Sequence, residues 1–231
     1  MNKNYKKNII DLSNRLITKE LPKSPISEQY RTIRTNIEFS MVDKQLKTMI
    51  CTSANPSEGK STTIANLATT FAQQDKKVLF VDADLRKPTA HRRFQIENQI
   101  GLTTVLTKHL SLEQATCTTN VDNLWLLPSG PIPPNPAELL GSKSMRELIK
   151  DATEVFDMII FDAPPVLAVT DAQILGNICD GAVLVVKSNS TEKEALQKAK
   201  SLLDKANVNV VGVVLNGVEP ENTSSYYYYG E

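Results

Sequence analysis

The sequence has few of the side chains that build metal sites and disulfides. Its 231 residues include three cysteines, Cys51, Cys117 and Cys179, which are odd in number and far apart. No Cys-x-x-Cys pair and no Cys/His spacing typical of a zinc site occurs. We therefore expect buried free thiols in a reducing cytosol. The two histidines, His91 and His109, have no obvious partners, and we expect surface or structural roles for them.

Net charge and long apolar runs are also absent. The chain has 26 basic and 26 acidic residues, so it lacks the electrostatic footprint of a nucleic-acid-binding protein. No apolar run approaches the roughly 20 residues that span a bilayer. The N-terminus begins with basic residues but lacks the apolar stretch and the small-residue cleavage site of a signal peptide. We expect a cytoplasmic protein, with any membrane association made through a partner.

The two ends of the chain differ from its middle. Residues 1–26 are polar and end in a segment containing Pro22 and Pro25, which favours an extended arm. Residues 220–231 form a polar tail that holds four of the six tyrosines, Tyr226, Tyr227, Tyr228 and Tyr229. We expect residues 27–219 to form one domain, and the tail to be flexible.

A helix is predicted to begin near Ser27, a suitable N-cap, with Glu28 in its first turn. An apolar stripe at helical spacing supports this helix, formed by Tyr30, Ile33, Ile37 and Met41. Glu28, Arg31 and Arg34 recur every three residues on a neighbouring face. From the residues alone, such charges are usually a solvated face, where each ion pair contributes about 0–1 kcal/mol.

Strands and helices alternate from residue 47 onward. Strands are predicted at KTMICTS, KVLFVDA, NLWLLPS, DMIIFDA, GAVLVVKS and VNVVGVVLN. Helices are predicted to follow the first of these strands and near residues 136–153, 170–178 and 191–206. KVLFVDA is a continuous apolar run, as expected for a strand covered on both faces. The alternation indicates an α/β fold with a mostly parallel sheet and helices on both faces, similar to P-loop NTPases.

The segment SANPSEGKST follows the first predicted strand and opens a helix. It matches the G-x-x-x-x-G-K-[ST] pattern except that Ala54 replaces the first glycine. Backbone N–H groups and a helix N-terminus form an anion site, so we expect ATP phosphates here. The predicted ATP-binding residues of this loop are Asn55, Pro56, Ser57, Glu58, Gly59, Lys60, Ser61 and Thr62. Lys60 would reach the β- and γ-phosphates, and Ser61 would bind Mg²⁺; the alternative is a plain strand–turn–helix connection.

Three aspartates end two of the predicted strands. Asp162 ends DMIIFDA, where P-loop enzymes usually place a carboxylate that holds Mg²⁺. Asp82 and Asp84 follow another strand, and ligands bind at strand C-termini in open α/β sheets. A lone aspartate there is more often a helix cap, but three converging on the edge that carries Lys60 weaken that interpretation. Arg86 is expected to meet phosphate charge or to pair with these aspartates.

Together these motifs resemble the bacterial tyrosine kinases known as BY-kinases. VLFVDADLR is similar to their extra Walker A′ motif, IIFD to their Walker B strand, and SANPSEGKST to their relaxed Walker A. Glu28, Arg31 and Arg34 match their E-x-x-R-x-x-R motif, and YYYY resembles their tyrosine cluster. The resemblance covers roughly residue 20 to the end. It is closest to the separate cytoplasmic kinase subunit of Gram-positive capsule and exopolysaccharide systems.

The resemblance implies a kinase that uses ATP and Mg²⁺ to autophosphorylate on tyrosine. Phosphate would pass in trans to Tyr226–Tyr229, and the helix of Glu28, Arg31 and Arg34 would join subunits in a ring, possibly an octamer. A transmembrane chain-length regulator would activate the subunit through a cytoplasmic C-terminal segment and recruit it to the inner face of the membrane.

Each candidate catalytic residue has an expected role. Lys60, Mg²⁺ and possibly Arg86 would supply positive charge, and Ser61 and Asp162 would hold the metal. Asp82 is the candidate base for the tyrosine hydroxyl and a further metal contact, while Asp84 would shape or assist the site. Asn216 ends the last predicted strand, where it is equally suited to contact the purine or to form a turn.

Two other functions remain open at this point. One is a partner-activated ATPase switch of the Min/Par type, although those proteins usually have a second lysine at the position of Asn55. The other is a nucleotide-binding scaffold that docks through its aromatic tail and would tolerate loss of Asp82. A eukaryotic kinase fold is excluded because the H-R-D and D-F-G motifs are missing.

Overall fold

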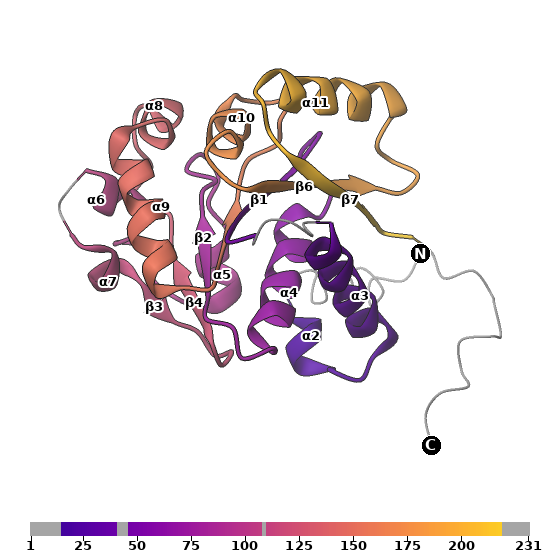
Figure 1. The fold of residues 1–231 in the computed structure, drawn as a ribbon, viewed down its shortest axis with the longest axis horizontal. Coiled ribbons are helices and arrows are strands. Elements are labelled where there is room, and N and C mark those ends of the chain that lie inside the picture. The colour runs from indigo at the N-terminus through magenta and orange to yellow at the C-terminus, as the bar shows by residue number, and fades with distance from the viewer. Residues whose placement is uncertain (1–14, 41–45, 108–109, 219–231) are drawn as a thin grey trace, which may run out of the picture.

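A seven-stranded sheet forms the centre of the computed structural model, which describes residues 15–40, 46–107 and 110–218 (Figure 1). The strands are β1 (Thr48–Ser53), β2 (Val78–Asp82), β3 (Cys117–Thr118), β4 (Leu124–Leu127), β5 (Met158–Asp162), β6 (Gly181–Lys187) and β7 (Val210–Asn216). Their order is β3-β4-β2-β5-β1-β6-β7, and all pair in parallel except β3, which runs antiparallel to β4. This confirms the predicted α/β class and the mostly parallel sheet.

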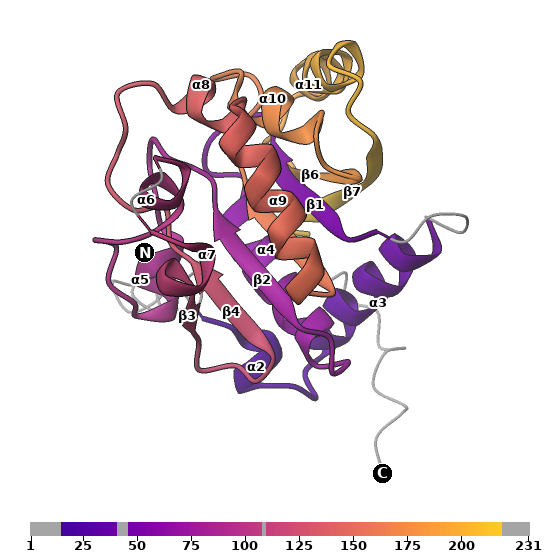
Figure 2. The same ribbon diagram turned by 60° about the vertical axis from the view of Figure 1, so that its left-hand side comes forward.

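Helices cover both faces of this sheet (Figures 1 and 2). One face carries α2 (Ile17–Glu20), α3 (Pro25–Phe39), α4 (Lys60–Ala72) and α5 (Ala90–Phe94). The other carries α6 (Leu102–Leu106), α7 (Leu112–Ala115), α8 (Pro136–Leu140), α9 (Lys143–Val155), α10 (Asp171–Gly176) and α11 (Lys193–Lys205). None of the helices in the described part of the chain is long and apolar enough to cross a membrane.

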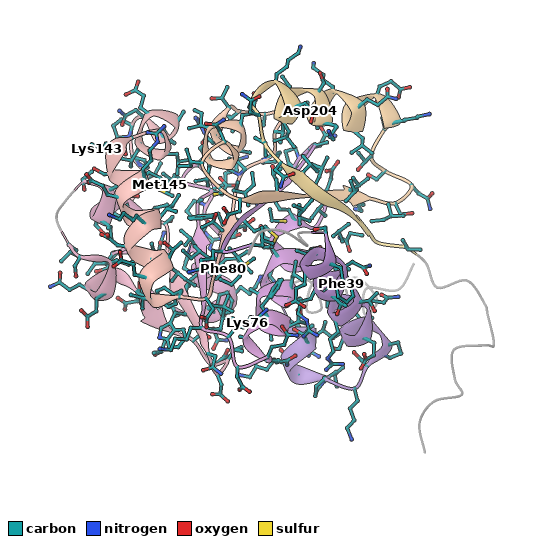
Figure 3. All side chains as sticks on the ribbon, in the orientation of Figure 1. Phe39, Lys76, Phe80, Lys143, Met145 and Asp204 are labelled. Carbon is teal, nitrogen blue, oxygen red and sulfur yellow. The ribbon has the colours of Figure 1, made fainter. Side chains whose placement is uncertain are left out.

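The core has two layers because successive strand residues point to opposite faces. In β2, Phe80 belongs to the cluster under α4, whereas Leu79 and Val81 pack beneath α9. Phe80 and Met145 of α9, both labelled in Figure 3, are almost fully buried in these two layers. Because β1, β2 and β5 are covered on both sides, every residue in them is buried, which explains the continuous apolar runs of β2 and β5.

The N-terminal segment differs from the extended arm expected for residues 1–26. Its described part forms α2, in which buried Thr18 contacts Asn66 of α4: the Thr18 N–H and hydroxyl donate to Asn66 Oδ1 at 3.1 and 3.0 Å. Residues 1–14 lie outside the described residues. The expectation of an extended arm is therefore wrong for residues 17–20, because a buried threonine–asparagine contact holds a helical turn against α4.

The next predicted helix is present with Glu28 in its first turn, but its predicted N-cap, Ser27, is wrong. Helix α3 begins at Pro25, and its N-cap is Ser24, whose hydroxyl accepts from the Ser27 N–H at 3.2 Å. Proline suits the first helical position because its missing N–H has no partner there in any case. Ser27 is buried instead, and its hydroxyl donates to the Leu21 carbonyl at 2.7 Å.

The helix predicted near 136–153 is two helices. Helix α8 ends at Leu140, and α9 begins at Lys143 after the N-cap Ser142, which accepts from the Met145 N–H at 3.2 Å. A serine side chain that satisfies the first-turn N–H starts a new helix. The short elements β3, α5, α6 and α7 were not predicted, because each is too short to show a period.

Candidate active site

The loop from β1 to α4 has the backbone of a phosphate cradle. Gly59 has φ +87°, a conformation that side chains rarely adopt, and a Cβ at this position would lie 1.9 Å from Asn216 Nδ2, so a side chain would strain the backbone and displace Asn216. Ser57 also has a positive φ of 65°, which is uncommon outside glycine. Ala54, in place of the usual first glycine, is fully buried against the core. The loop enters α4 at Lys60, so its N–H groups and the helix N-terminus can face an anion.

Two distant segments hold this loop in place. The Asn216 amide at the end of β7 donates to the Glu58 carbonyl at 3.0 Å. The Glu58 carboxylate accepts from the Thr191 hydroxyl at 2.7 Å and from the Asn55 amide at 3.3 Å. The structure therefore gives Asn216 a bracing contact with the loop, while its contact with a purine stays a prediction. Sequence reasoning missed Thr191, because no local pattern places the β6–α11 connection beside the loop.

Lys60 and Asp162 form a buried ion pair at the start of α4. Their side chains are 8% and 1% exposed, and the Lys60 ammonium also lies 3.3 Å from the Ser61 hydroxyl. Burial alone would lower the pKa of Lys60, but the charge of Asp162 raises it above its ordinary value. The structure thus brings together three of the residues predicted to act on phosphate and metal.

Asp82 lies beside Asp162, because β2 and β5 are neighbours in register at these residues. One oxygen of Asp82, Oδ2, accepts from the backbone N–H groups of Thr89 and Ala90 at 3.0 and 2.9 Å. Burial, followed by the nearby charge of Asp162, raises the pKa of Asp82 to about 7. Asp82 is therefore a carboxylate that can gain or lose a proton near neutral pH.

The donor set fits Mg²⁺. Asp82 Oδ1 and Asp162 Oδ2 are buried without a hydrogen-bond partner among the described residues. Orphaned carboxylate oxygens are unusual inside proteins, and oxygen is the ligand that Mg²⁺ prefers. In residues 15–40, 46–107 and 110–218, no group of three His, Cys, Asp or Glu side chains could hold a metal by itself. A magnesium ion here would therefore share the Ser61 hydroxyl and phosphate oxygens.

Asp84 and Arg86 make hydrogen bonds within the protein that the sequence did not predict. Asp84 is half-buried, burial raises its pKa, and its Oδ1 accepts from the Lys87 N–H at 3.0 Å as in a turn. Arg86 donates through Nε and Nη2 to the two oxygens of Asp171, at 2.9 and 3.0 Å. Of the two roles expected for Arg86, pairing with the strand-end aspartates is wrong, because fully buried Asp171 accepts from both Nε and Nη2, while contact with phosphate stays a prediction. No sequence signal identified Asp171.

The side chains of the E-x-x-R-x-x-R motif project from α3. Arg31 pairs with Glu28 and donates to the Pro22 carbonyl at 2.6 Å. Arg34 instead donates to the Thr70 carbonyl of α4 at 2.9 Å. Glu28 remains 65% exposed. The motif thus contains one outward residue and one that fastens α3 to α4, and its role between subunits stays a prediction.

Comparisons with known proteins agree with this geometry. Residues 54–210 match the family described as an AAA domain. The chain is 59% identical to tyrosine-protein kinase YwqD of Bacillus subtilis (strain 168), over 90% of this chain and 88% of that protein. It is 41% identical to the putative tyrosine-protein kinase CapB of Staphylococcus aureus, over 94% of this chain and 95% of that protein.

Solved structures show the same fold. The kinase domain of Escherichia coli tyrosine kinase ETK has a TM-score of 0.86 and 32% identity, over 94% of this chain and 85% of that one. The chimerical protein CapA2B2 has a TM-score of 0.84 and 41% identity, over 87% and 88%. MinD of Pyrococcus horikoshii, solved with Mg-ADP, is more distant: its TM-score is 0.62 and its identity 26%, over 73% and 69%. The chain belongs to the family of bacterial tyrosine-protein kinases.

Proposed function

We propose that this chain transfers the γ-phosphate of ATP to the tyrosine cluster Tyr226–Tyr229 of a neighbouring copy. The observation that carries the proposal is a group at the phosphate cradle: Lys60 at the start of α4 pairs with Asp162 at the end of β5, and Asp82 lies beside Asp162 at the end of β2. The acceptor tyrosines lie outside the described residues, so their role rests on the family and on their position in the sequence.

The side chains divide the phosphoryl transfer between them. The loop N–H groups and the N-terminus of α4 bind the β- and γ-phosphates, and Lys60 turns from Asp162 toward them. Ser61 and Asp162 would hold Mg²⁺, which would supply positive charge near the transferred phosphoryl group. A new O–P bond forms to the tyrosine oxygen while the bond from Pγ to the β-phosphate oxygen breaks, releasing ADP.

Asp82 accepts the tyrosine proton as the oxygen attacks. The unperturbed tyrosine hydroxyl has a pKa near 10, so it is mostly neutral at pH 7 and needs a base. Asp82 has a raised pKa of about 7 and an unpartnered oxygen, Oδ1, to take the proton. The hydrogen bonds from Thr89 and Ala90 hold the other oxygen and orient the carboxylate. Asp84 stabilises the loop that supplies these N–H groups.

Autophosphorylation tests the proposal directly. The purified chain is treated with phosphatase and incubated with ATP and Mg²⁺, with and without the cytoplasmic segment of its membrane partner, and the tail is then analysed by mass spectrometry. We expect phosphate on Tyr226–Tyr229. Lys60→Met should abolish it and Asp82→Ala should reduce it at least about 100-fold, the range of general-base catalysis. Absence of phosphate from all four tyrosines in both reactions would refute the proposal.

The same reaction separates a kinase from a Min/Par-type switch, which shares this fold. A switch would hydrolyse ATP without labelling tyrosine, and a scaffold would tolerate Asp82→Ala. We therefore expect ADP production and phosphotyrosine to fall together in both variants. Rapid ATP turnover with an unmodified tail would favour the switch.

We further propose that the kinase acts in capsule or exopolysaccharide synthesis as a ring-shaped oligomer, possibly an octamer. A transmembrane chain-length regulator would recruit it to the inner face of the membrane and activate it through a cytoplasmic C-terminal segment. The resemblance of the motifs to this class of subunit supports the setting, as does the likeness to CapB and to the chimerical protein CapA2B2. Deletion of the gene should change polysaccharide chain length, and an inactive Lys60→Met copy should fail to restore it.

A further inference from the structure

A surface cavity of roughly 500 Å³ lies next to the candidate active site. It is lined by residues 86–89, 91, 92, 98 and 130–132, from the loop after β2, from α5 and from the proline-rich loop after β4. Asn98 fixes the far wall, because its amide donates to the Gly130 carbonyl at 3.2 Å and accepts from the Gly130 N–H at 2.9 Å. None of the contacts that form the phosphate cradle uses this cavity.

The near wall of the cavity is positively charged. Arg86, Lys87 and Arg92 line it, and no acidic residue does. Asp171 neutralises Arg86, but within the described residues no ion pair involves Lys87 or Arg92, and both are exposed. The two free cations of Lys87 and Arg92 suit an anion with several acceptor oxygens, such as a phosphate monoester.

The remaining wall is apolar. Pro88 faces the cavity from one side, and Pro131 and Ile132 face it from the other. The Ile132 side chain is 65% exposed and adds little to the core. A flat apolar surface beside cationic groups suits an aromatic ring that carries a phosphate, because the ring can pack on proline and isoleucine while the oxygens meet Lys87 and Arg92. Free phosphate would leave the apolar wall unused.

The cavity shares its wall with the candidate base. The Thr89 N–H that lines it donates to Asp82, and the Lys87 N–H donates to Asp84. An extended chain advances about 3.3–3.6 Å per residue, so tyrosines two apart in YYYY lie roughly 7 Å from each other. Because Thr89 both lines the cavity and contacts Asp82, a tyrosine two residues from the one at Asp82 is placed on the side of the chain that faces the cavity.

We propose that this cavity binds a phosphotyrosine of the tail of a second copy while another tyrosine of the same tail is at Asp82. The inference rests on the proposed function and deepens it. The first phosphate would hold the tail at the active site and favour phosphorylation of the adjacent tyrosines. The four consecutive tyrosines of one tail would then be phosphorylated one after another, instead of phosphates being added at random among different tails.

Peptide binding tests the cavity without catalysis. The probe is a labelled peptide of residues 222–231, with or without phosphate on Tyr228, added to phosphatase-treated full-length chain. A non-hydrolysable ATP analogue and Mg²⁺ fill the phosphate cradle. We expect the phosphopeptide to bind at least about tenfold more tightly than the plain peptide, because charge-assisted hydrogen bonds are gained. Phenyl phosphate should displace it at lower concentration than inorganic phosphate.

The variant Lys87→Gln/Arg92→Gln should lose this preference. Lys193→Gln/Lys198→Gln on α11 removes the same charge from exposed positions elsewhere and should keep it. Thermal melting verifies that both variants are folded. An unchanged preference in the cavity variant would overturn the proposal, and so would equal displacement by phenyl phosphate and inorganic phosphate.

Mass spectrometry of the tail during autophosphorylation provides a second readout. In the wild-type chain, the fraction of tails with two or more phosphates should exceed the fraction expected if phosphates were added to tyrosines at random. The cavity variant should add its first phosphate at the wild-type rate but distribute later ones at random. A random distribution in the wild-type chain would contradict filling in succession. If the chain fails to phosphorylate itself, the proposed function fails, while the peptide experiment still decides whether the cavity binds phosphotyrosine.

Discussion

At the scale of single residues, the negative charge of Asp82 lowers the stability of the folded protein. The carboxylate is fully buried beside Asp162, and one of its oxygens has no partner in the described chain. Its pKa of about 7 in the folded protein exceeds the ordinary value of 3.8. The folded state thus binds the proton more tightly than the unfolded state, so stability falls as pH rises from about 4 to 7. Such a cost is understandable where a metal or a proton is to be accepted.

Asp82→Asn should therefore stabilise the nucleotide-free protein at neutral and alkaline pH. The neutral amide removes the buried charge, and its NH₂ group can face Asp162. We expect a gain on the order of 2–4 kcal/mol at pH 8 and little gain at pH 4, since each pKa unit is worth about 1.4 kcal/mol. Urea unfolding at both pH values, without Mg²⁺, measures it. Asp151→Asn on the exposed side of α9 is the control, and equal gains at the two pH values would contradict the expectation.

Gly59 gives a second prediction at this scale. Gly59→Ala should abolish ATP binding, because the new Cβ would meet Asn216 at 1.9 Å and φ +87° disfavours any side chain. Gly212→Ala in β7 is the matched control, since its Cβ would meet nothing within 4 Å and its φ is not positive. Titration with a fluorescent ATP analogue should show binding only in the control. Comparable affinities would show that the loop tolerates another conformation.

At the scale of elements, α3 has one face that packs on the domain and a neighbouring face that carries the exposed residues of the E-x-x-R-x-x-R motif. Tyr30 and Ile37 turn toward the body of the domain, as the predicted apolar stripe requires, and Ile37 is 4% exposed while burial raises the pKa of Tyr30. Arg34 adds a hydrogen bond to α4, whereas Glu28 and Arg31 lie at the outer end. The three motif residues should therefore respond differently to substitution.

Glu28→Ala and Arg31→Ala should lower the mass of the assembly and leave the melting temperature nearly unchanged. Arg34→Ala should also lower the free energy of unfolding by about 1–3 kcal/mol, because a charged donor to a buried carbonyl is lost. Light scattering and urea unfolding separate the two effects. Asn36→Ala, at an exposed position of the same helix, serves as control. An assembly unaffected by Glu28→Ala and Arg31→Ala would leave the motif with a role in α3 packing alone.

At the scale of the whole molecule, the proposed phosphorylation of the tail would change the net charge of each subunit. The chain has 26 basic and 26 acidic residues, so its net charge is near zero. Each phosphotyrosine adds about −1.5 to −2 charges at neutral pH, and four would add roughly −6 to −8 to every subunit. In a ring, such tails repel one another and their neighbours.

Phosphorylation should therefore dissociate the assembly. Light scattering before and after incubation with ATP and Mg²⁺ should show a fall from the mass of the proposed ring to that of smaller species. The Lys60→Met protein, treated identically, should keep its mass. If mass spectrometry shows full phosphorylation while the mass of the assembly is unchanged, the subunit contacts withstand the added charge.

Much of the fold and of the site could be predicted because the signals are local. The apolar runs around Ile50, Phe80 and Ile160 predicted central strands, and the site residues Lys60, Asp82 and Asp162 follow from strand ends that meet at one edge of a parallel sheet. The break between α8 and α9 was missed because only two residues separate the helices, Gly141 as the C-cap of α8 and Ser142 as the N-cap of α9. The packed turn of α2 was missed because its polar residues show no period.

The sequence by itself determined the α/β class, the phosphate cradle and the order of the motifs, because hydrophobic period and glycine–lysine–serine spacing act over a few residues. Only the tertiary structure decided which distant groups meet. Asn216 and Thr191 brace Glu58, Asp171 takes Arg86 from the strand-end aspartates, and Pro131 closes a basic cavity. These contacts join segments far apart along the chain, and their geometry depends on how whole elements dock, which no local period encodes.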